Sequence, residues 1–175
     1  MNKVLLENPS IDISSPIVLI TTVNPQNGKP NIMTLCWIGG VTAQPPQISI
    51  SINTRNFSHN LVKESKEFAV NIPSADQIEQ VTICGTKSGR DIDKWKECGF
   101  TPAKGIKIAV PLIEECPVNL ECRVKMFIPA EEIGTNSLFI AEVLATHRRE
   151  DITSGINIIP PCYSAGRFGK IVSLA

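Results

Sequence analysis

The chain has 175 residues, of which 42% are hydrophobic and 19% charged, the composition of an ordinary globular protein. Its 17 Lys and Arg residues balance its 17 Asp and Glu residues, so the formal net charge is zero. A neutral chain has no global field with which to hold nucleic acid or an anionic membrane. The sequence therefore predicts neither partner, and the length predicts a single domain over residues 1–175.

The N-terminal ten residues contain one lysine and too short an apolar run for a signal peptide. No apolar run in the sequence approaches the length of a transmembrane helix. We therefore expect a cytoplasmic protein whose cysteines are reduced thiols used as small core residues. They form no CxxC pair and no zinc-finger spacing with a histidine, which predicts no metal site and no structural disulfide. The six are Cys36, Cys84, Cys98, Cys116, Cys122 and Cys162.

In the first part of the chain, the sequence pattern predicts strands joined by turns. An apolar, β-branched run predicts a strand from Ile17 to Val23, and Asn31 to Ile38 follows as a second strand after the hairpin turn at Asn27-Gly28. We expect Gly39-Gly40 and Pro45-Pro46 to break the chain before the next strand.

A candidate anion site follows that next strand. From Gln47 to Ile52, isoleucines alternate with polar residues, the period of a half-buried strand. The strand runs into the loop 53–60, where Ser58 is a good N-cap for a helix from Asn60 to Phe68. The loop gathers hydroxyls, amides, the Arg55 guanidinium and helix-start N–H groups, and phosphate binds where such donors and a helix dipole converge. The alternative is an ordinary capped helix with a solvated arginine.

In the middle of the chain, the sequence pattern predicts one more strand and two helices. Glu67 to Asn71 is typical of a strand. The segment Ser74 to Gln77 fits a capping box that opens a helix to about Cys84. Asp91 or Asp93 opens a short helix that Gly99 closes, with Trp95 and Cys98 on one face.

The second half returns to strands. Apolar residues at every second position from Leu120 to Ile128 predict a strand, and a turn at residues 134–136 leads into a long strand from Ser137 to His147. Helices do not alternate with strands, which disfavours a parallel sheet. The sequence therefore predicts a mainly β fold with inserted helices, a closed or split barrel.

The sequence offers little for acid–base or metal chemistry. The phosphate-binding, dinucleotide-binding, nucleophile-elbow and zinc-protease motifs are absent. His59 and His147 are the only histidines, and we expect surface roles for both; the alternative for His59, in the first turn of a helix, is an approach to a bound anion. No catalytic side chain is predicted, so the chemistry is expected to come from a bound cofactor.

Three motifs together carry a family resemblance. They are Asn31 to Thr42 with Gln44 to Ser49, Asn53 to Asn60, and Cys84 to Trp95. In this order and spacing they resemble the flavin reductase-like family, whose members bind FMN in a split β-barrel; the nearest branch is similar to flavoredoxin and the related archaeal ferric reductases. The resemblance runs from about Pro16 to Arg149 and includes similar patterns at Glu115 to Cys122 and Pro160 to Phe168. Cys36 departs from the pattern, because another small residue is expected there.

The resemblance implies an FMN site built from the three motifs. The implied cofactor-binding residues are Asn31, Met33, Thr34, Leu35, Cys36, Trp37, Asn53, Thr54, Arg55, Ser58, Asn60, Ser88, Gly89 and Lys94. The strand from Asn31 to Trp37 is expected beside the flavin ring, where backbone groups and the Thr34 hydroxyl meet the ring edge. Core packing is the alternative for Met33 and Trp37.

The other two motifs are expected at the phosphate and around it. Arg55 and Ser58, with Thr54, take the phosphate through charge-assisted bonds and the helix start. Gly89 allows the backbone to approach a ligand closely. Lys94 lies either near the phosphate or near N1 and O2 of the ring, and the sequence leaves both open.

The implied function is that of an FMN-dependent oxidoreductase. It takes hydride from NAD(P)H and passes electrons to an acceptor: a flavin, ferric iron or a redox partner protein. The resemblance also implies a homodimer. Two alternatives stay open: a flavoredoxin-like electron carrier without substrate turnover, and a binding module that uses the barrel for another ligand.

Overall fold

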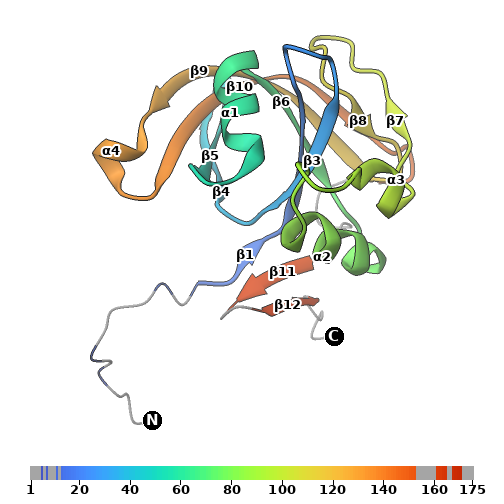
Figure 1. Cartoon of the computed structure of the whole chain (residues 1–175). Coiled ribbons are helices and arrows are strands. Elements are labelled where there is room, and N and C mark those ends of the chain that lie inside the picture. The colour runs from blue at the N-terminus through green and yellow to red at the C-terminus, as the bar shows by residue number, and fades with distance from the viewer. Residues whose placement is uncertain are drawn as a thin grey trace.

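The computed structural model describes residues 5, 7, 11, 13–152, 161–164 and 167–170. A seven-stranded antiparallel sheet dominates these residues (Figure 1), in the order β3-β2-β6-β9-β10-β5-β4. Its strands are β2 (Val18–Val23), β3 (Pro30–Leu35), β4 (Ile38–Ala43), β5 (Pro46–Asn53), β6 (Glu67–Ile72), β9 (Val118–Ile128) and β10 (Asn136–Arg148). The prediction of a mainly β fold is confirmed.

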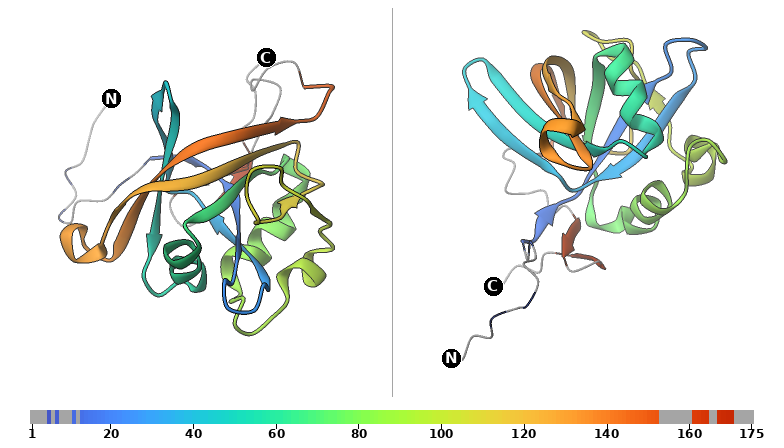
Figure 2. Two further views of the ribbon diagram at one scale, coloured as in Figure 1. Left: turned by 90° about the horizontal axis from the view of Figure 1, so that it is seen from above. Right: turned by 60° about the vertical axis from the view of Figure 1, so that its left-hand side comes forward.

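The sheet curls into a barrel that stays open on one side (Figure 2). Its two edge strands, β3 and β4, are separated by only Cys36 and Trp37 in the chain, yet they stand at opposite ends of the strand order. The described residues add two small antiparallel sheets. These consist of β1 (Ser15–Pro16), β11 (Pro161–Ser164) and β12 (Arg167–Lys170) in one, and β7 (Pro102–Ala103) and β8 (Leu112–Ile113) in the other. Part of the family-like tail, including Pro160, lies outside the described residues.

The prediction for the segment after β3 was wrong. Gly39 and Gly40 were expected to break the chain, but both lie inside β4, opposite Ser49 and Ile48 of β5. The hairpin turns instead at the cis peptide bond between Gln44 and Pro45. Strand β4 is an exposed edge, so it carries no apolar alternation that would reveal it in the sequence.

Helices fill the gaps between the strands. They are α1 (Phe57–Ser65), the short 3₁₀ helix η1 (Ala75–Gln77), α2 (Ile78–Thr86), α3 (Lys94–Cys98) and α4 (Ala130–Ile133). The capping box at Ser74 and Gln77 is confirmed. Asp93, rather than Asp91, caps α3 by accepting the Trp95 N–H at 3.1 Å, and Gly99 ends the helix at φ 66°. Helix α4 was not predicted. No helix among the described residues is long and apolar enough to cross a bilayer.

Helix α1 begins earlier than predicted. Asn56 is its N-cap, whereas Ser58 lies buried in the first turn and Lys66 ends the helix in a left-handed conformation. Phe68, expected at the end of the helix, belongs to β6 and is fully buried in the barrel. The barrel core therefore decides where the helix stops.

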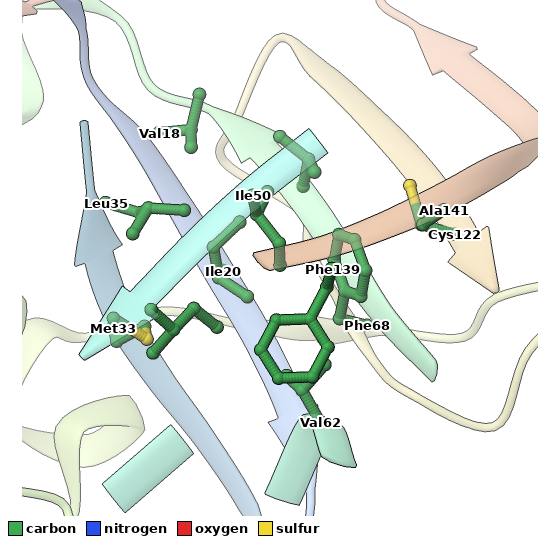
Figure 3. Packing of buried hydrophobic residues seen from close by; sticks show 12 residues of the cluster. Val18, Ile20, Met33, Leu35, Ile50, Val62, Phe68, Cys122, Phe139 and Ala141 are labelled. Atoms are coloured by element: carbon green, nitrogen blue, oxygen red, sulfur yellow. The ribbon is translucent and has the colours of Figure 1, made fainter. Parts of the chain in front are cut away.

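The two larger hydrophobic clusters of the described residues contribute most to the core. One fills the barrel interior, where Ile50, Phe68 and Phe139 meet (Figure 3). The other lies between the barrel wall and the helices α2 and α3. Strand β2 serves both, because Ile20 points into the barrel and Leu19 into the second cluster. Burial on both faces explains why β2 is rich in apolar and β-branched residues without a polar alternation.

The long strand β9 departs from its predicted alternation. Val124 pairs with Ala141, but Met126 pairs with the adjacent Ile140, so β9 carries one extra residue there. Such a bulge exchanges the two faces of a strand. Met126, predicted on the apolar face, is therefore 54% exposed, and Phe127 packs against the barrel core instead.

The surface role expected for His59 was wrong, and that expected for His147 holds only in part, because its side chain is 32% exposed. His59 is buried, with Nε2 2.9 Å from the Ser137 hydroxyl and its ring edge-on to Phe139. His147 lies with Nε2 2.6 Å from the Glu121 carboxylate, which is 0% exposed. Both histidines hold strands in place.

Candidate functional site: a cationic cavity beside the first helix

A cavity of about 220 Å³ opens where β3 meets the ends of α1, α2 and α3. Its walls come from β3, the start of α1, the end of α2, the loop that follows α2, and the first residue of α3. The lining residues are Asn31, Met33, Thr34, Arg55, Asn56, Phe57, Ser58, Cys84, Gly85, Thr86, Lys87, Ser88, Gly89, Arg90 and Lys94. All three motifs of the sequence analysis thus contribute to one site.

In the part of the chain that the structure describes, the wall of this cavity carries four cationic side chains and no carboxylate. Lys87 is neutralised by Glu97 at 2.8 Å, and Arg90 lies over the Phe57 ring with 5.1 Å to its centroid. Arg55 is exposed, and its guanidinium makes no ion pair within the part of the chain that the structure describes. Since the whole chain is neutral, this local excess of positive charge suits an anionic ligand.

The start of α1 strengthens the preference for an anion. Its N-cap, Asn56, makes no side-chain cap bond, and its first turn holds no acidic residue. The helix dipole therefore faces the cavity without a countercharge. The Ser58 hydroxyl oxygen accepts the Asn31 Nδ2–H at 2.8 Å, which leaves the hydroxyl hydrogen available to donate.

Close backbone approach at Gly89 shapes the opposite wall. A Cβ atom at this position would lie 1.9 Å from Oδ1 of Asn31 and 3.2 Å from the Phe57 ring. Any larger residue would collide with Asn31, which is itself held by Ser58. Gly89 was expected to let the backbone approach a ligand; what the structure shows is its approach to Asn31.

Lys94 is buried at the base of the cavity. Its Nζ donates a hydrogen bond to the Cys84 carbonyl oxygen at 2.7 Å. Burial lowers the pKa of Lys94, and the neighbouring Cys84 and Cys98 sulfurs oppose that shift. The first residue of a helix is electrostatically unfavourable for a cation, so a buried lysine here suits a ligand-facing role.

The structure brings eight of the fourteen predicted site residues to this cavity: Asn31, Met33, Thr34, Arg55, Ser58, Ser88, Gly89 and Lys94. Leu35 points into the barrel core, Cys36 packs against the second cluster, and Trp37 is 49% exposed. Asn53 bonds to Asn136, Thr54 is exposed, and Asn60 bonds to His59. For these six, a cofactor role stays a prediction.

Seven lining residues were not in the predicted set: Asn56, Phe57, Cys84, Gly85, Thr86, Lys87 and Arg90. All seven belong to the second and third motifs, so the motif boundaries were the signal that could have found them. Thr34 also makes a contact that the sequence did not predict, because its hydroxyl donates to the Val81 carbonyl oxygen at 2.5 Å and ties β3 to α2. No three His, Cys, Asp or Glu side chains of the described residues gather as a metal site.

An antiparallel split barrel with an anion-favouring cavity at its side is thus the class of structure that the chain forms. Residues 11–171 match the family model of the flavin reductase like domain. Because the match covers most of the chain, the protein belongs to the flavin reductase-like family, as the motifs predicted.

Two relatives show how far the sequence similarity extends. An uncharacterized protein of Archaeoglobus fulgidus is 36% identical over 120 residues, which are 68% of this chain and 66% of that protein. The ferric-chelate reductase (NAD(P)H) of the same organism is 28% identical over 106 residues, 59% of either chain. The alignments thus cover less than two thirds of these relatives' own lengths.

Solved structures share the fold over the full chain. Flavoredoxin from Methanosarcina acetivorans has a TM-score of 0.86 and 25% identity, covering 100% of this chain and 94% of that one. The FMN-binding protein from Thermus thermophilus, with bound p-hydroxybenzaldehyde, has a TM-score of 0.83 and 20% identity over 100% and 99% of the two chains.

Proposed function

We propose that this protein binds FMN at the cationic cavity and passes reducing equivalents from NAD(P)H through FMN to an acceptor: a flavin, ferric iron or a protein. Membership of the flavin reductase-like family supports the proposal, as do a ferric-chelate reductase among the relatives and an FMN-binding protein among the similar structures. The observation that carries it is the cavity wall with four cations and no carboxylate, at the uncapped start of α1.

The residues present fit the phosphate end of FMN. Arg55 has no ion-pair partner among the described residues, the Ser58 hydroxyl hydrogen can donate, and the first turn of α1 presents N–H groups. The cavity of about 220 Å³ is smaller than the roughly 300–1,000 Å³ that is typical of small-molecule sites. We therefore assign to it the phosphate and the adjoining part of the cofactor.

The protein's own contribution is binding and orientation. Among the described residues, no histidine or carboxylate lines the cavity, so the commonest general acids and bases are missing from its wall. Bound FMN supplies the hydride and electron transfer that side chains lack. The Thr34 bond to Val81 fixes the wall between β3 and α2, and the Asn31 bond to Ser58 fixes the wall between β3 and α1.

A flavoredoxin-like electron carrier is the second candidate, favoured by the likeness to flavoredoxin over the whole chain. The two functions differ in their response to reduced nicotinamide. Under anaerobic conditions, NADH or NADPH added to the FMN-loaded protein should bleach the visible flavin absorbance within seconds if the protein is an oxidoreductase. Bleaching no faster than that of free FMN would favour the carrier. A protein that refuses FMN would point to a binding module for another ligand.

We expect Lys94→Met to change the bound cofactor more than the fold. Methionine keeps the apolar stem and removes the charge. It orphans the Cys84 carbonyl oxygen but also removes the desolvation penalty of a buried ammonium, so the free energy of unfolding should change by less than about 2 kcal/mol. If the ammonium lies near N1 and O2 of the ring, the two-electron potential of bound FMN should fall by about 30 mV for each 1.4 kcal/mol lost. Redox titration measures this.

Binding data complete the Lys94 test. A loss of FMN affinity without a change in potential would place Lys94 at the phosphate instead. Unchanged affinity and unchanged potential would contradict a ligand role and leave Lys94 as the structural partner of the Cys84 carbonyl.

We further propose a homodimer that covers the open side of the barrel. The edge strand β4 exposes Val41 to 47%, and Trp37 just before it is 49% exposed. Exposed apolar side chains grouped on a strand edge are typical of association surfaces. Light scattering should report about twice the 19.1 kDa mass of one chain.

A pair of lysine variants tests where the dimer forms. Val41→Lys should shift the protein to the monomer mass, because it places a charge in the proposed contact. Ile133→Lys replaces a similarly exposed residue of α4, at 54%, and should leave the dimer intact. A wild-type protein that is a monomer and still binds FMN would contradict the proposed dimer.

A further inference from the structure

Two cysteine sulfurs lie in contact beside the cavity. Sγ of Cys84, near the end of α2, is 3.6 Å from Sγ of Cys98, the last residue of α3. Cys84 is buried, and Cys98 is half-buried and donates a weak hydrogen bond to the Gln80 carbonyl oxygen at 3.8 Å. The sequence predicted that the thiols serve only as core residues, and its spacing gave no sign of this pair.

We propose that Cys84 and Cys98 form a redox-active dithiol that closes reversibly to a disulfide. A disulfide bond is about 2.05 Å long, so the two sulfurs need to approach by only about 1.5 Å. Both cysteines belong to helices, and the sulfurs already face each other across the α2–α3 contact. The proposal does not depend on which anion the cavity holds.

The chemistry balances with a peroxide as the oxidant. Cys98 is the more exposed thiol, so its thiolate attacks the peroxide O–O bond, forms a sulfenic acid and releases hydroxide. The Cys84 sulfur then attacks Sγ of Cys98, the S–S bond forms and the hydroxyl leaves as water. Two thiols and one hydrogen peroxide thus give one disulfide and two waters, and a small-molecule dithiol reverses the change by exchange.

Exposure and the hydrogen bond between the two thiols favour Cys98 as the thiol that reacts first. Burial raises the pKa of Cys98, and the hydrogen bond from Cys84 and the charge of Lys94 oppose that shift, while Glu97 adds to it and Lys87 offsets Glu97. Cys84 is more deeply buried, and its pKa is raised by burial and by the neighbouring Cys98. Cys98 is therefore better suited to meet the oxidant, and Cys84 to resolve the sulfenic acid.

The disulfide would lock one wall of the cavity. The chain between the two cysteines, residues 85–97, contributes seven of the lining residues: Gly85, Thr86, Lys87, Ser88, Gly89, Arg90 and Lys94. Oxidation would close this segment into a covalent loop and restrict its motion. The redox state of the pair would thus set the mobility of the wall that carries Gly89 and Lys94.

Peptide mapping tests the pairing directly. The reduced protein is treated with one equivalent of hydrogen peroxide, alkylated, digested and analysed by mass spectrometry. We expect a Cys84–Cys98 linked peptide, a fall in free thiols from six to four, and full recovery with dithiothreitol. Tm should rise on oxidation by roughly 5–10 °C, because a loop of this length is cross-linked.

Two serine variants separate this pair from the other thiols. Cys98→Ser should abolish the linked peptide and the Tm rise, whereas Cys162→Ser, which alters a half-buried cysteine of β11, should keep both. A disulfide from Cys84 to Cys116 would overturn the assignment. So would over-oxidation of Cys98 with Cys84 left free, or a linked pair without any change in Tm.

Discussion

Glu121→Gln should lower the free energy of unfolding by about 3 kcal/mol at pH 7, since hydrogen bonds to a charged acceptor are worth roughly 1.5–3 kcal/mol each. The Glu121 carboxylate is fully buried and accepts the backbone N–H groups of Ile106, Lys107 and Ile108 at 3.0, 2.7 and 2.9 Å. It also lies 2.6 Å from His147 Nε2. Glutamine keeps one acceptor oxygen but turns an NH₂ group toward donors, so buried N–H groups lose their partner.

Urea unfolding at fixed protein concentration measures this loss, and Glu67→Gln is the matched control. Glu67 holds the next residue of the same loop, through the Ala109 N–H at 3.1 Å, but its side chain is partly exposed and pairs with Arg123 at the surface. Glu67→Gln should lower the free energy of unfolding by less than half as much as Glu121→Gln does. Equal losses for both variants would contradict the assigned role of Glu121.

The buried Glu121 carboxylate should also make the stability of the fold depend on pH in acid. Burial would raise the pKa of Glu121, but the loop N–H donors and His147 outweigh it and hold the pKa below the ordinary value of 4.5. A depressed pKa means that the stabilisation is present above the unfolded pKa and is lost as pH falls through the folded one. Wild type should therefore lose stability more steeply below about pH 4.5 than Glu121→Gln does.

Gly89→Ala should destabilise the fold by about 2 kcal/mol, as overpacking usually does, and should weaken FMN binding. The new Cβ would lie 1.9 Å from Oδ1 of Asn31. Asn31 is buried and bonded to Ser58, so relief of the clash breaks that bond and moves the wall that presents the Ser58 hydroxyl.

A double-mutant cycle tests the mechanism of the clash. In an Asn31→Ala background the space beside residue 89 is free, so Gly89→Ala should then cost little stability. If Gly89→Ala destabilised the fold just as much in the Asn31→Ala background, the strain would come from the Gly89 backbone and not from Asn31.

Elements with a clean local signal were predictable. The isoleucine alternation of β5, the apolar run of β2 and the caps at Ser74 and Asp93 each rest on neighbouring residues. Strand β4 and the end of α1 were not predictable in this way. An exposed glycine-containing edge has no period, and the barrel core rather than helix propensity places Phe68 in a strand.

The site residues divide in the same way, into those with a local sequence signal and those that depend on non-local contacts. Arg55, Ser58, Gly89 and Lys94 were found because they lie in contiguous motifs with a physical reason for each residue type. Non-local contacts stayed hidden. Glu121 alternates like a surface residue, but a loop fifteen residues away folds over it, and Cys84 meets Cys98 only because α2 packs on α3.

Titration of FMN and riboflavin tests the central claim most directly. Wild type should bind FMN about 10–100-fold more tightly, because the phosphate adds a charge-assisted contact worth roughly 1.5–3 kcal/mol. Arg55→Ala should lose most of that preference with little change in riboflavin affinity. Arg149→Ala, an exposed arginine paired with Asp151 outside the cavity, should keep it. Equal affinity of wild type for the two flavins would contradict the assignment of the cavity to the phosphate.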